Sequence, residues 1–236
     1  DDHLGTLLSN APISLPPGAT YDHIVSNTAM ATVTNTATWT GADSAGGFAV
    51  NDTIPYNFED ISGTGTAVPL GDDEVSLALP MGFTFDYFGV NYTDAYISSN
   101  GFLTFLPGQS NGCCTGQAIP TAGSPDAIIA AWWEDLYPPG GGSIQYQTLG
   151  VAPNRYFIAQ YTNLPHFSSG NPVTMQVKLF EGTNVIEVHY QDAPSDSGTH
   201  SAGVENETGT VGVQYVLQST GLVTPLAVQY TPATAV

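Results

Sequence analysis

The residues best suited to covalent chemistry are two adjacent cysteines, Cys113 and Cys114, in the segment SNGCCTG at residues 110–116. They are the only cysteines of the chain, so the spaced pairs of a zinc finger are missing. The pair can form a vicinal disulfide, stay as two free thiols or bond to another chain. We predict the disulfide, because Gly112 and Gly116 permit a tight turn and such bonds persist in oxidising compartments.

Carboxylates gather in loops, and they are the ligand type that calcium requires. Calcium takes about 6–8 oxygen ligands, and the regular loop of an EF-hand is absent here. A further acidic loop contains Asp192 and Asp196, and solvated turns are the alternative interpretation of all these loops. Calcium is the one cofactor that the sequence suggests, with candidate ligands Glu59, Asp60, Asp72, Asp73 and Glu74.

An acidic pair, Glu134 and Asp135, directly follows Trp132 and Trp133, and acids beside aromatic rings occur in sugar-binding and sugar-cleaving sites. Successive strand residues point to opposite faces, whereas the two carboxyls of a glycosidase lie ~5–9.5 Å apart across the substrate. The adjacent acids therefore cannot form such a pair. We expect the tryptophans to fill the core, with an aromatic ligand surface as the alternative.

Other polar motifs do not add up to an enzyme. The segment SGTHSAG at residues 197–203 looks like the surroundings of a subtilase histidine, and DSAGG at residues 43–47 looks like a trypsin-type serine loop, but their companion motifs are missing. His166, His189 and His200 lack the close spacing that places metal ligands on one element. We expect these histidines to be hydrogen-bonded or exposed, and we predict no catalytic residue.

The charge balance excludes two classes of partner. The 236 residues contain 21 Asp and Glu but only Arg155 and Lys178 as bases, for a net charge of −19. Binding to nucleic acid or to anionic lipid needs clustered bases, so neither is a partner. No apolar run approaches the ~20 residues of a membrane span, which predicts no membrane insertion.

Composition favours an extracellular or cell-surface protein. The chain has one Lys, 26 Gly and 17 Pro, and it starts at Asp1 without Met, from which we expect a processed N-terminus. Three Asn-x-Thr sequences, at Asn51, Asn91 and Asn206, are candidate glycosylation acceptors. They matter only in a host that glycosylates its surface proteins.

Short apolar runs bounded by Gly, Pro, Asn or Asp recur along the chain and predict strands. Asn100-Gly101 between two such runs is the strongest hairpin signal, and Glu181-Gly182-Thr183-Asn184 is a second one. The fold class predicted is all-β, a β-sandwich or jelly-roll-like body over residues 51–236. The predicted strands are Glu74–Leu79, Phe83–Phe88, Asp94–Ser98, Phe102–Leu106, Ile128–Trp133, Ser143–Thr148, Arg155–Tyr161, Val173–Phe180, Asn184–Tyr190, Ser201–Asn206, Val211–Leu217 and Leu226–Tyr230.

Residues 1–50 form a predicted arm with one strand, residues 30–40, where threonines alternate with mostly small apolar residues. A lone strand must pair with a sheet edge to satisfy its backbone groups. If that edge belongs to another copy, the chain becomes a subunit of a filament. The residues predicted to make this assembly contact are Ala31, Val33, Ala37 and Trp39.

Six segments follow one another in an order that resembles a known domain: YISSNGFLTF (96–105), IIAAWWEDL (128–136), SIQYQTL (143–149), RYFIAQYTNLPHF (155–167), TMQVKLFEGTNVIEVHY (174–190) and AGVENETG (202–209). They resemble a β-rich domain of secreted bacterial and archaeal surface proteins and, more distantly, the nidogen extracellular domain. The resemblance covers roughly residues 55–230. It implies an extracellular structural or adhesive role and no catalytic residues.

We therefore expect a non-catalytic extracellular structural protein, either a self-assembling, pilus-like filament subunit or a surface adhesive domain. Its expected partners are further copies of itself, and also glycans or other surface proteins. The alternative is a carbohydrate-binding module of a secreted system.

Overall fold

The computed structural model describes residues 47–233. The predicted assembly strand, with Ala31, Val33, Ala37 and Trp39, lies outside these residues and stays a prediction. Within them no helix is long and apolar enough to cross a membrane. The elements are β1 (Phe48–Asn51), β2 (Thr66–Ala67), β3 (Leu79–Tyr87), β4 (Val90–Ile97), β5 (Phe102–Thr104), β6 (Ile128–Trp133), η1 (Pro138–Gly140), β7 (Ser143–Leu149), β8 (Tyr156–Pro165), β9 (Pro172–Phe180), β10 (Ile186–Asp192), β11 (His200–Glu205), β12 (Gly212–Gln218) and β13 (Leu226–Pro232).

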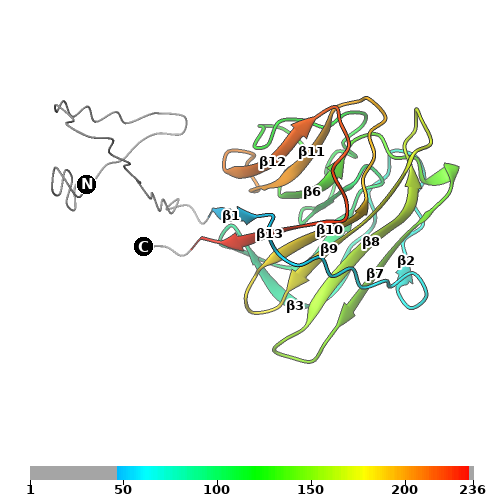
Figure 1. The fold of residues 1–236 in the computed structure, drawn as a ribbon. Helices are drawn as coiled ribbons and strands as arrows, with labels where there is room; N and C mark the ends of the chain where they lie inside the picture. Colours follow the sequence, from blue (N-terminus) through cyan, green and yellow to red (C-terminus); the bar gives the residue numbers. More distant parts are fainter. Residues whose placement is uncertain (1–46, 234–236) are drawn as a thin grey trace, which may run out of the picture. The chain divides into compact units, whose positions relative to one another are not determined.

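The strands form two antiparallel sheets that pack face to face (Figure 1). The seven-stranded sheet has the order β1-β13-β10-β9-β8-β7-β2, and the six-stranded sheet has the order β12-β11-β6-β5-β4-β3. The predicted β-sandwich is confirmed. β1 pairs with β13, so residues 48–50, predicted to belong to the arm, are part of this sheet.

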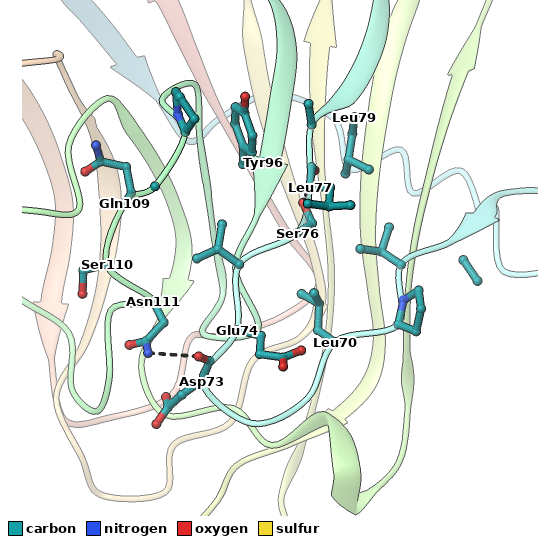
Figure 2. Close-up of a pocket in the computed structure, with 17 residues that line it drawn as sticks. Leu70, Asp73, Glu74, Ser76, Leu77, Leu79, Tyr96, Gln109, Ser110 and Asn111 are labelled. Atoms are coloured by element: carbon teal, nitrogen blue, oxygen red, sulfur yellow. Dashed lines mark hydrogen bonds between the residues drawn. The ribbon is translucent and has the colours of Figure 1, made fainter.

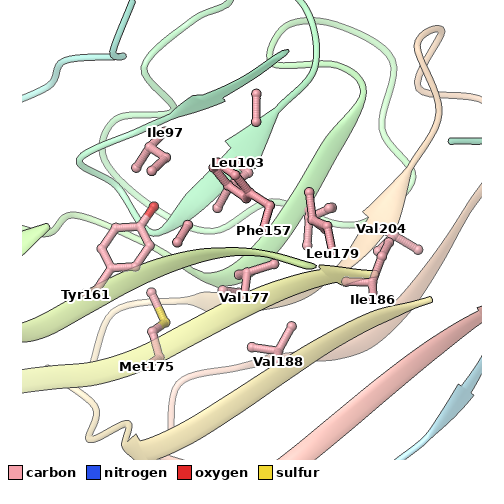
Figure 3. Packing of buried hydrophobic residues seen from close by; sticks show 14 of the residues in the cluster. Ile97, Leu103, Phe157, Tyr161, Met175, Val177, Leu179, Ile186, Val188 and Val204 are labelled. Carbon is pink, nitrogen blue, oxygen red and sulfur yellow. The ribbon is translucent and has the colours of Figure 1, made fainter. Parts of the chain in front are cut away.

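The core lies between the sheets because apolar residues alternate along the central strands. Phe157 and Tyr161 on β8, and Val177 on β9, are fully buried and face the other sheet. Figure 3 shows these side chains packing against Ile97 and Leu103. Burial of this continuous apolar layer is the main stabilising contribution to the fold.

The outer face of β8, β9 and β10 is also covered, by residues 56–61, which we call the strap. Buried polar side chains of the strands bind the strap's backbone groups in place of a neighbouring strand. This explains why Lys178, one of the two bases, lies inside the protein with 3% exposure. The bonds run from Ile61 N–H to Gln160 Oε1 at 2.9 Å, from Glu59 N–H to Gln176 Oε1 at 2.9 Å, and from Lys178 Nζ to Asn57 O at 2.7 Å.

Residues 112–119 pack against the outer face of β6, and every residue of β6 is buried. Trp132 belongs to the core between the sheets, whereas Trp133 packs outward against Phe102 and Ile119. The Trp133 indole donates a hydrogen bond to the backbone oxygen of Gly112 at 2.7 Å. This second small core explains a strand that lacks the usual alternation of buried and exposed residues.

Most strand predictions are confirmed, and β6 has the predicted bounds. The prediction of a strand over Glu74–Leu79 is wrong: β3 begins only at Leu79, and in the preceding segment Val75 forms a single bridge with Ser98. Both predicted turns are present, with positive φ at Gly101, Gly182 and Asn184.

Trypsin is expected to leave the native chain whole. Its only targets follow Arg155 and Lys178. The backbone N–H and C=O of Arg155 both bind Glu181, and Lys178 lies inside the central strand β9. Extended backbone that is already paired cannot enter a protease site. Prolonged digestion followed by intact mass measurement tests this, with urea-unfolded protein as the cleavable control. Rapid cutting of the native chain at either residue would show that these pairings are not maintained.

Candidate functional site

One end of the sandwich brings together strand ends from both sheets. In the six-stranded sheet β6 is followed by Glu134, and the antiparallel neighbour β11 begins at His200. In the other sheet β8 is followed by His166, which forms an antiparallel bridge with Leu136. The topology therefore delivers two histidines and a glutamate, distant in the sequence, to one place.

Asp196, in the loop before β11, completes a cluster that we call the buried quartet: Glu134, His166, Asp196 and His200. Each residue offers one donor atom within 4.8 Å of the other three. His166 Nε2 lies 3.0 Å from Glu134 Oε1, and His200 Nε2 lies 3.3 Å from Asp196 Oδ1 and 3.9 Å from Glu134 Oε2. The side chains are 0% exposed for both histidines, 2% for Glu134 and 8% for Asp196.

The outer nitrogen of each imidazole faces the backbone. His166 Nδ1 lies 2.7 Å from the oxygen of Asn171, and His200 Nδ1 lies 3.3 Å from that of Gln218. A carbonyl oxygen can only accept, so both Nδ1 atoms must donate. In a neutral imidazole this leaves Nε2 with its lone pair directed into the quartet.

Aromatic packing fixes the plane of His200. Its ring stacks on the indole of Trp132, with ring centroids 4.7 Å apart and an interplanar angle of 20°. The His166 ring stands nearly perpendicular to that of His200, at 88° and 5.6 Å between centroids. The two lone pairs are thus held in orientation by packing as well as by hydrogen bonds.

Burial sets the protonation of the quartet. It raises the pKa of Glu134 to about 8, with a further contribution from the charge of Asp196. Burial lowers the pKa of His166 to about 4, against the opposing effect of Asp196, and it also lowers the pKa of His200. The pKa of Asp196 is raised by burial but lowered overall, because the Ser168 hydroxyl and the Gly198 amide donate to its carboxylate. Both histidines are therefore neutral at pH 7.

A second group of side chains lies at the surface nearby: Asp73, Asp135 and the two cysteines, again within 4.8 Å of one another. Cys113 and Cys114 are joined as the predicted vicinal pair, and both are exposed. Disulfide sulfurs are not thiolates, so this group lacks soft metal ligands. Burial, with the charges of Asp73, Asp72 and Asp196, raises the pKa of Asp135 to about 6.

A groove of about 1060 Å³ begins beside Asp73 and runs along the segment that precedes β3. Figure 2 shows Leu70, Leu77, Leu79 and Tyr96 along it, and Asn111 donating to the backbone oxygen of Asp73 at 2.9 Å. Leu77 is 88% exposed. The groove offers an apolar surface with acidic side chains at one end.

The five predicted calcium ligands do not converge on one point among the described residues. Glu59 accepts from the Tyr156 hydroxyl at 2.8 Å, and Asp60 accepts from Gln160 at 2.8 Å, so both help to hold the strap. Asp72, Asp73 and Glu74 lie in a separate loop, where Glu74 binds the Gly71 amide. Calcium binding at either loop stays a prediction.

The other predicted site residues have varied surroundings. Trp132 and Trp133 are 0% and 2% exposed, so both are core residues and neither can serve as a sugar platform. Asn51 and Asn91 are exposed, whereas the Asn206 side chain accepts hydrogen bonds from two backbone amides of its own turn.

His166 and His200 are hydrogen-bonded through Nδ1, as expected, but the sequence spacing did not reveal that both also lie beside Glu134 and Asp196. Sequence spacing detects ligands that share one helix or strand, and these two residues come from different sheets. No local motif marks them. The one usable signal was the position of Glu134 and His166 immediately after long apolar strands, since such strand ends meet at the rim of a sandwich.

The architecture defines an antiparallel β-sandwich domain with a polar centre enclosed at one end. A family model described as NIDO related matches residues 47–235, and the chain belongs to this family. The resemblance to the nidogen domain is confirmed at this level, and the family assignment is that of an extracellular structural or adhesive domain. No solved structure matches the chain.

Proposed function

We propose that the chain is a non-catalytic structural protein of a cell surface, and that its copies join by adding a strand of one to a sheet of the next. The family assignment supports the extracellular structural role. The sheet edges support assembly by strand addition. The observation that carries this proposal is that β12 is an edge strand without charge or proline.

Four strands stand at sheet edges in the described part of the chain. β1 and β2 are only four and two residues long, and β3 contains Pro80, Asp86 and a break in its register. These are the features with which proteins protect an edge against further pairing. β12 has seven residues, GVQYVLQ, with no proline and no charge.

We assign one occupant to this edge, residues 30–40 of a second copy. That segment is also free of charge and proline, and its alternation of threonine with apolar residues suits a pleated sheet. Pairing the two would give backbone hydrogen-bond partners to both segments and would bury no unpartnered charge. Because donor and acceptor are different parts of the chain, the contact is head-to-tail and propagates.

The net charge of −19 opposes this association. Repulsion between like-charged copies is screened by salt over distances of about 8–10 Å at physiological ionic strength. Assembly is therefore expected to strengthen as salt concentration rises, opposite to what a contact held by ion pairs would show.

We also propose that the protein has no catalytic activity, and the burial of its polar cluster supports this. Glu134, His166 and His200 have side chains exposed by 2% or less, so a substrate cannot reach the groups whose chemistry is most suggestive. The competing adhesive role is favoured by the apolar groove beside Asp73, which is open to a binding partner (Figure 2). The buried tryptophans do not support the carbohydrate-binding alternative.

The test is the Leu217→Lys variant, which places a charge on β12 at a side chain that is 41% exposed. Full-length protein is measured by light scattering and negative-stain microscopy over a salt series. Val223→Lys, at a loop residue that is 91% exposed, is the control for the same change of charge. We expect wild type and Val223→Lys to form polymers and Leu217→Lys to stay monomeric. Wild-type protein that stays monomeric at all salt concentrations would refute strand addition and leave the adhesive role.

A further inference from the structure

We propose that the buried quartet is a binding site for one divalent transition-metal ion, and that zinc fits it best. The site is independent of the proposed assembly. Its role is to tie the two sheets together at one end of the sandwich, since Glu134 and His200 adjoin strands of one sheet and His166 adjoins a strand of the other.

The spacing of the donor atoms fits a tetrahedral ion. Zinc binds histidine nitrogen and carboxylate oxygen at about 2.0–2.2 Å, so two ligands of one tetrahedral ion lie roughly 3.4 Å apart. Three separations between donor atoms of the quartet are 3.0, 3.3 and 3.9 Å. Small shifts of the side chains would bring all four donors into range.

With both imidazoles protonated at Nδ1 and Glu134 present as a carboxylate, no proton is available for a hydrogen bond among the donor atoms of the quartet. Glu134 Oε1, His166 Nε2 and His200 Nε2 are buried and have no hydrogen-bond partner. Such atoms carry a desolvation cost that native proteins normally avoid. A single cation bound between these three atoms would satisfy all of them at once.

The surroundings match those of a metal-bound histidine. Such histidines usually donate their other ring N–H to a carbonyl or carboxylate, which fixes the tautomer and the ring plane. His166 and His200 both do this, toward the backbone oxygens of Asn171 and Gln218. The buried His189 has a different arrangement, because its Nδ1 accepts a hydrogen bond from the Asn57 amide at 3.2 Å.

The donor set also selects the type of metal. Two neutral imidazoles and two carboxylates balance the charge of a divalent ion, and imidazole favours zinc, copper, nickel or iron over calcium and magnesium. Four protein ligands with almost no exposure form a closed site, which is typical of structural zinc. Asp196 is the most exposed of the four, so its loop is the route by which an ion enters.

The experiment starts from the full chain stripped of metal by chelation and dialysed. Zinc chloride is then added, bound zinc is counted by elemental analysis, and unfolding is followed by heating. We expect one zinc per chain and, at free zinc of ~100 times Kd, a rise of roughly 5–10 °C in Tm. Manganese and cobalt are tested in parallel to rank the metals.

Variants separate this site from other donors. His166→Gln and His200→Gln should lose the bound zinc and the rise in Tm. His189→Gln removes a different buried histidine and should keep both, and so should the Cys113→Ser/Cys114→Ser double variant. Zinc retained by both quartet variants would overturn the proposal.

The ligands of the bound zinc can also be identified in the wild-type protein, without any variant. X-ray absorption of the zinc-loaded chain should show two imidazole nitrogens, two oxygens and no sulfur. If the quartet variants fail to fold, this spectrum decides. Zinc bound through sulfur, or a wild-type chain whose Tm responds to none of the three metals, would mean that the quartet is not a metal site.

Discussion

Gly101→Ala is expected to lower the free energy of unfolding by at least about 3 kcal/mol, more than an ordinary surface substitution. Gly101 has φ of +77°, and a Cβ there would overlap the carbonyl group of Trp132. The backbone oxygen of Gly101 accepts hydrogen bonds from the amides of Ala131 and Trp132, at 3.1 and 3.0 Å. The turn can therefore not move away from β6 without losing those bonds.

The matched control is Gly89→Ala, because Gly89 has φ of +83° and nothing within 4 Å of the added methyl group. It should cost only the conformational penalty, about 1–2 kcal/mol. Urea unfolding measures the loss of unfolding free energy in both variants, provided that their m-values equal that of the wild type. Equal losses in the two variants would show that the contact between the hairpin turn and β6 is loose, and would weaken the placement of Glu134, whose amide binds the Asn100 oxygen of the same turn.

Glu205→Gln is expected to stabilise the protein above pH 7 by on the order of 3 kcal/mol. Glu205 is fully buried, and burial raises its pKa to about 7. Its Oε2 accepts from the Thr121 amide at 2.9 Å, while its Oε1 has no partner. A glutamine keeps the acceptor for Thr121 and carries no charge.

The direction of the pH dependence follows from the binding of a proton by Glu205. The folded protein holds this proton more tightly than the unfolded chain, whose glutamates have a pKa of about 4.3. Wild-type stability therefore falls as pH rises from about 4.5 to about 7 and stays lowered above that range. The variant should lack this part of the pH dependence.

Thermal unfolding from pH 4.5 to pH 9 measures the difference between wild type and Glu205→Gln. Glu207→Gln, which removes the same charge from an exposed residue of the turn that follows β11, is the control. Parallel curves for wild type and Glu205→Gln would show that Glu205 is charged in the folded protein without a stability cost.

Much of this fold could be predicted because its signals are local. The run Ile128–Trp133 is bounded by turn residues, and Asn100-Gly101 marks a hairpin by conformational preference alone. The segment Glu74–Leu79 has the composition of a strand but lacks ladder partners, which only the tertiary structure reveals. β2 is two residues long and has no pattern of its own.

The site was less predictable because most of its residues are far apart in the sequence. Cys113 and Cys114 are neighbours in the sequence, so their pairing could be expected. Glu134, His166 and His200 are brought together by the bridge between Leu136 and His166 and by the pairing of β6 with β11, which are long-range contacts. The position of an acid after two tryptophans was visible in the sequence, but its burial and the groups that surround it were not.

Assembly by strand addition requires that β12 accept a strand from another copy. A cryo-electron microscopy map of the assembled full-length protein tests this directly. It is predicted to show an additional strand beside β12, with side-chain density fitting residues 30–40 and connectivity leading to the neighbouring subunit. An extra strand that connects to the same subunit, or contacts between copies that leave β12 unpaired, would contradict assembly by strand addition.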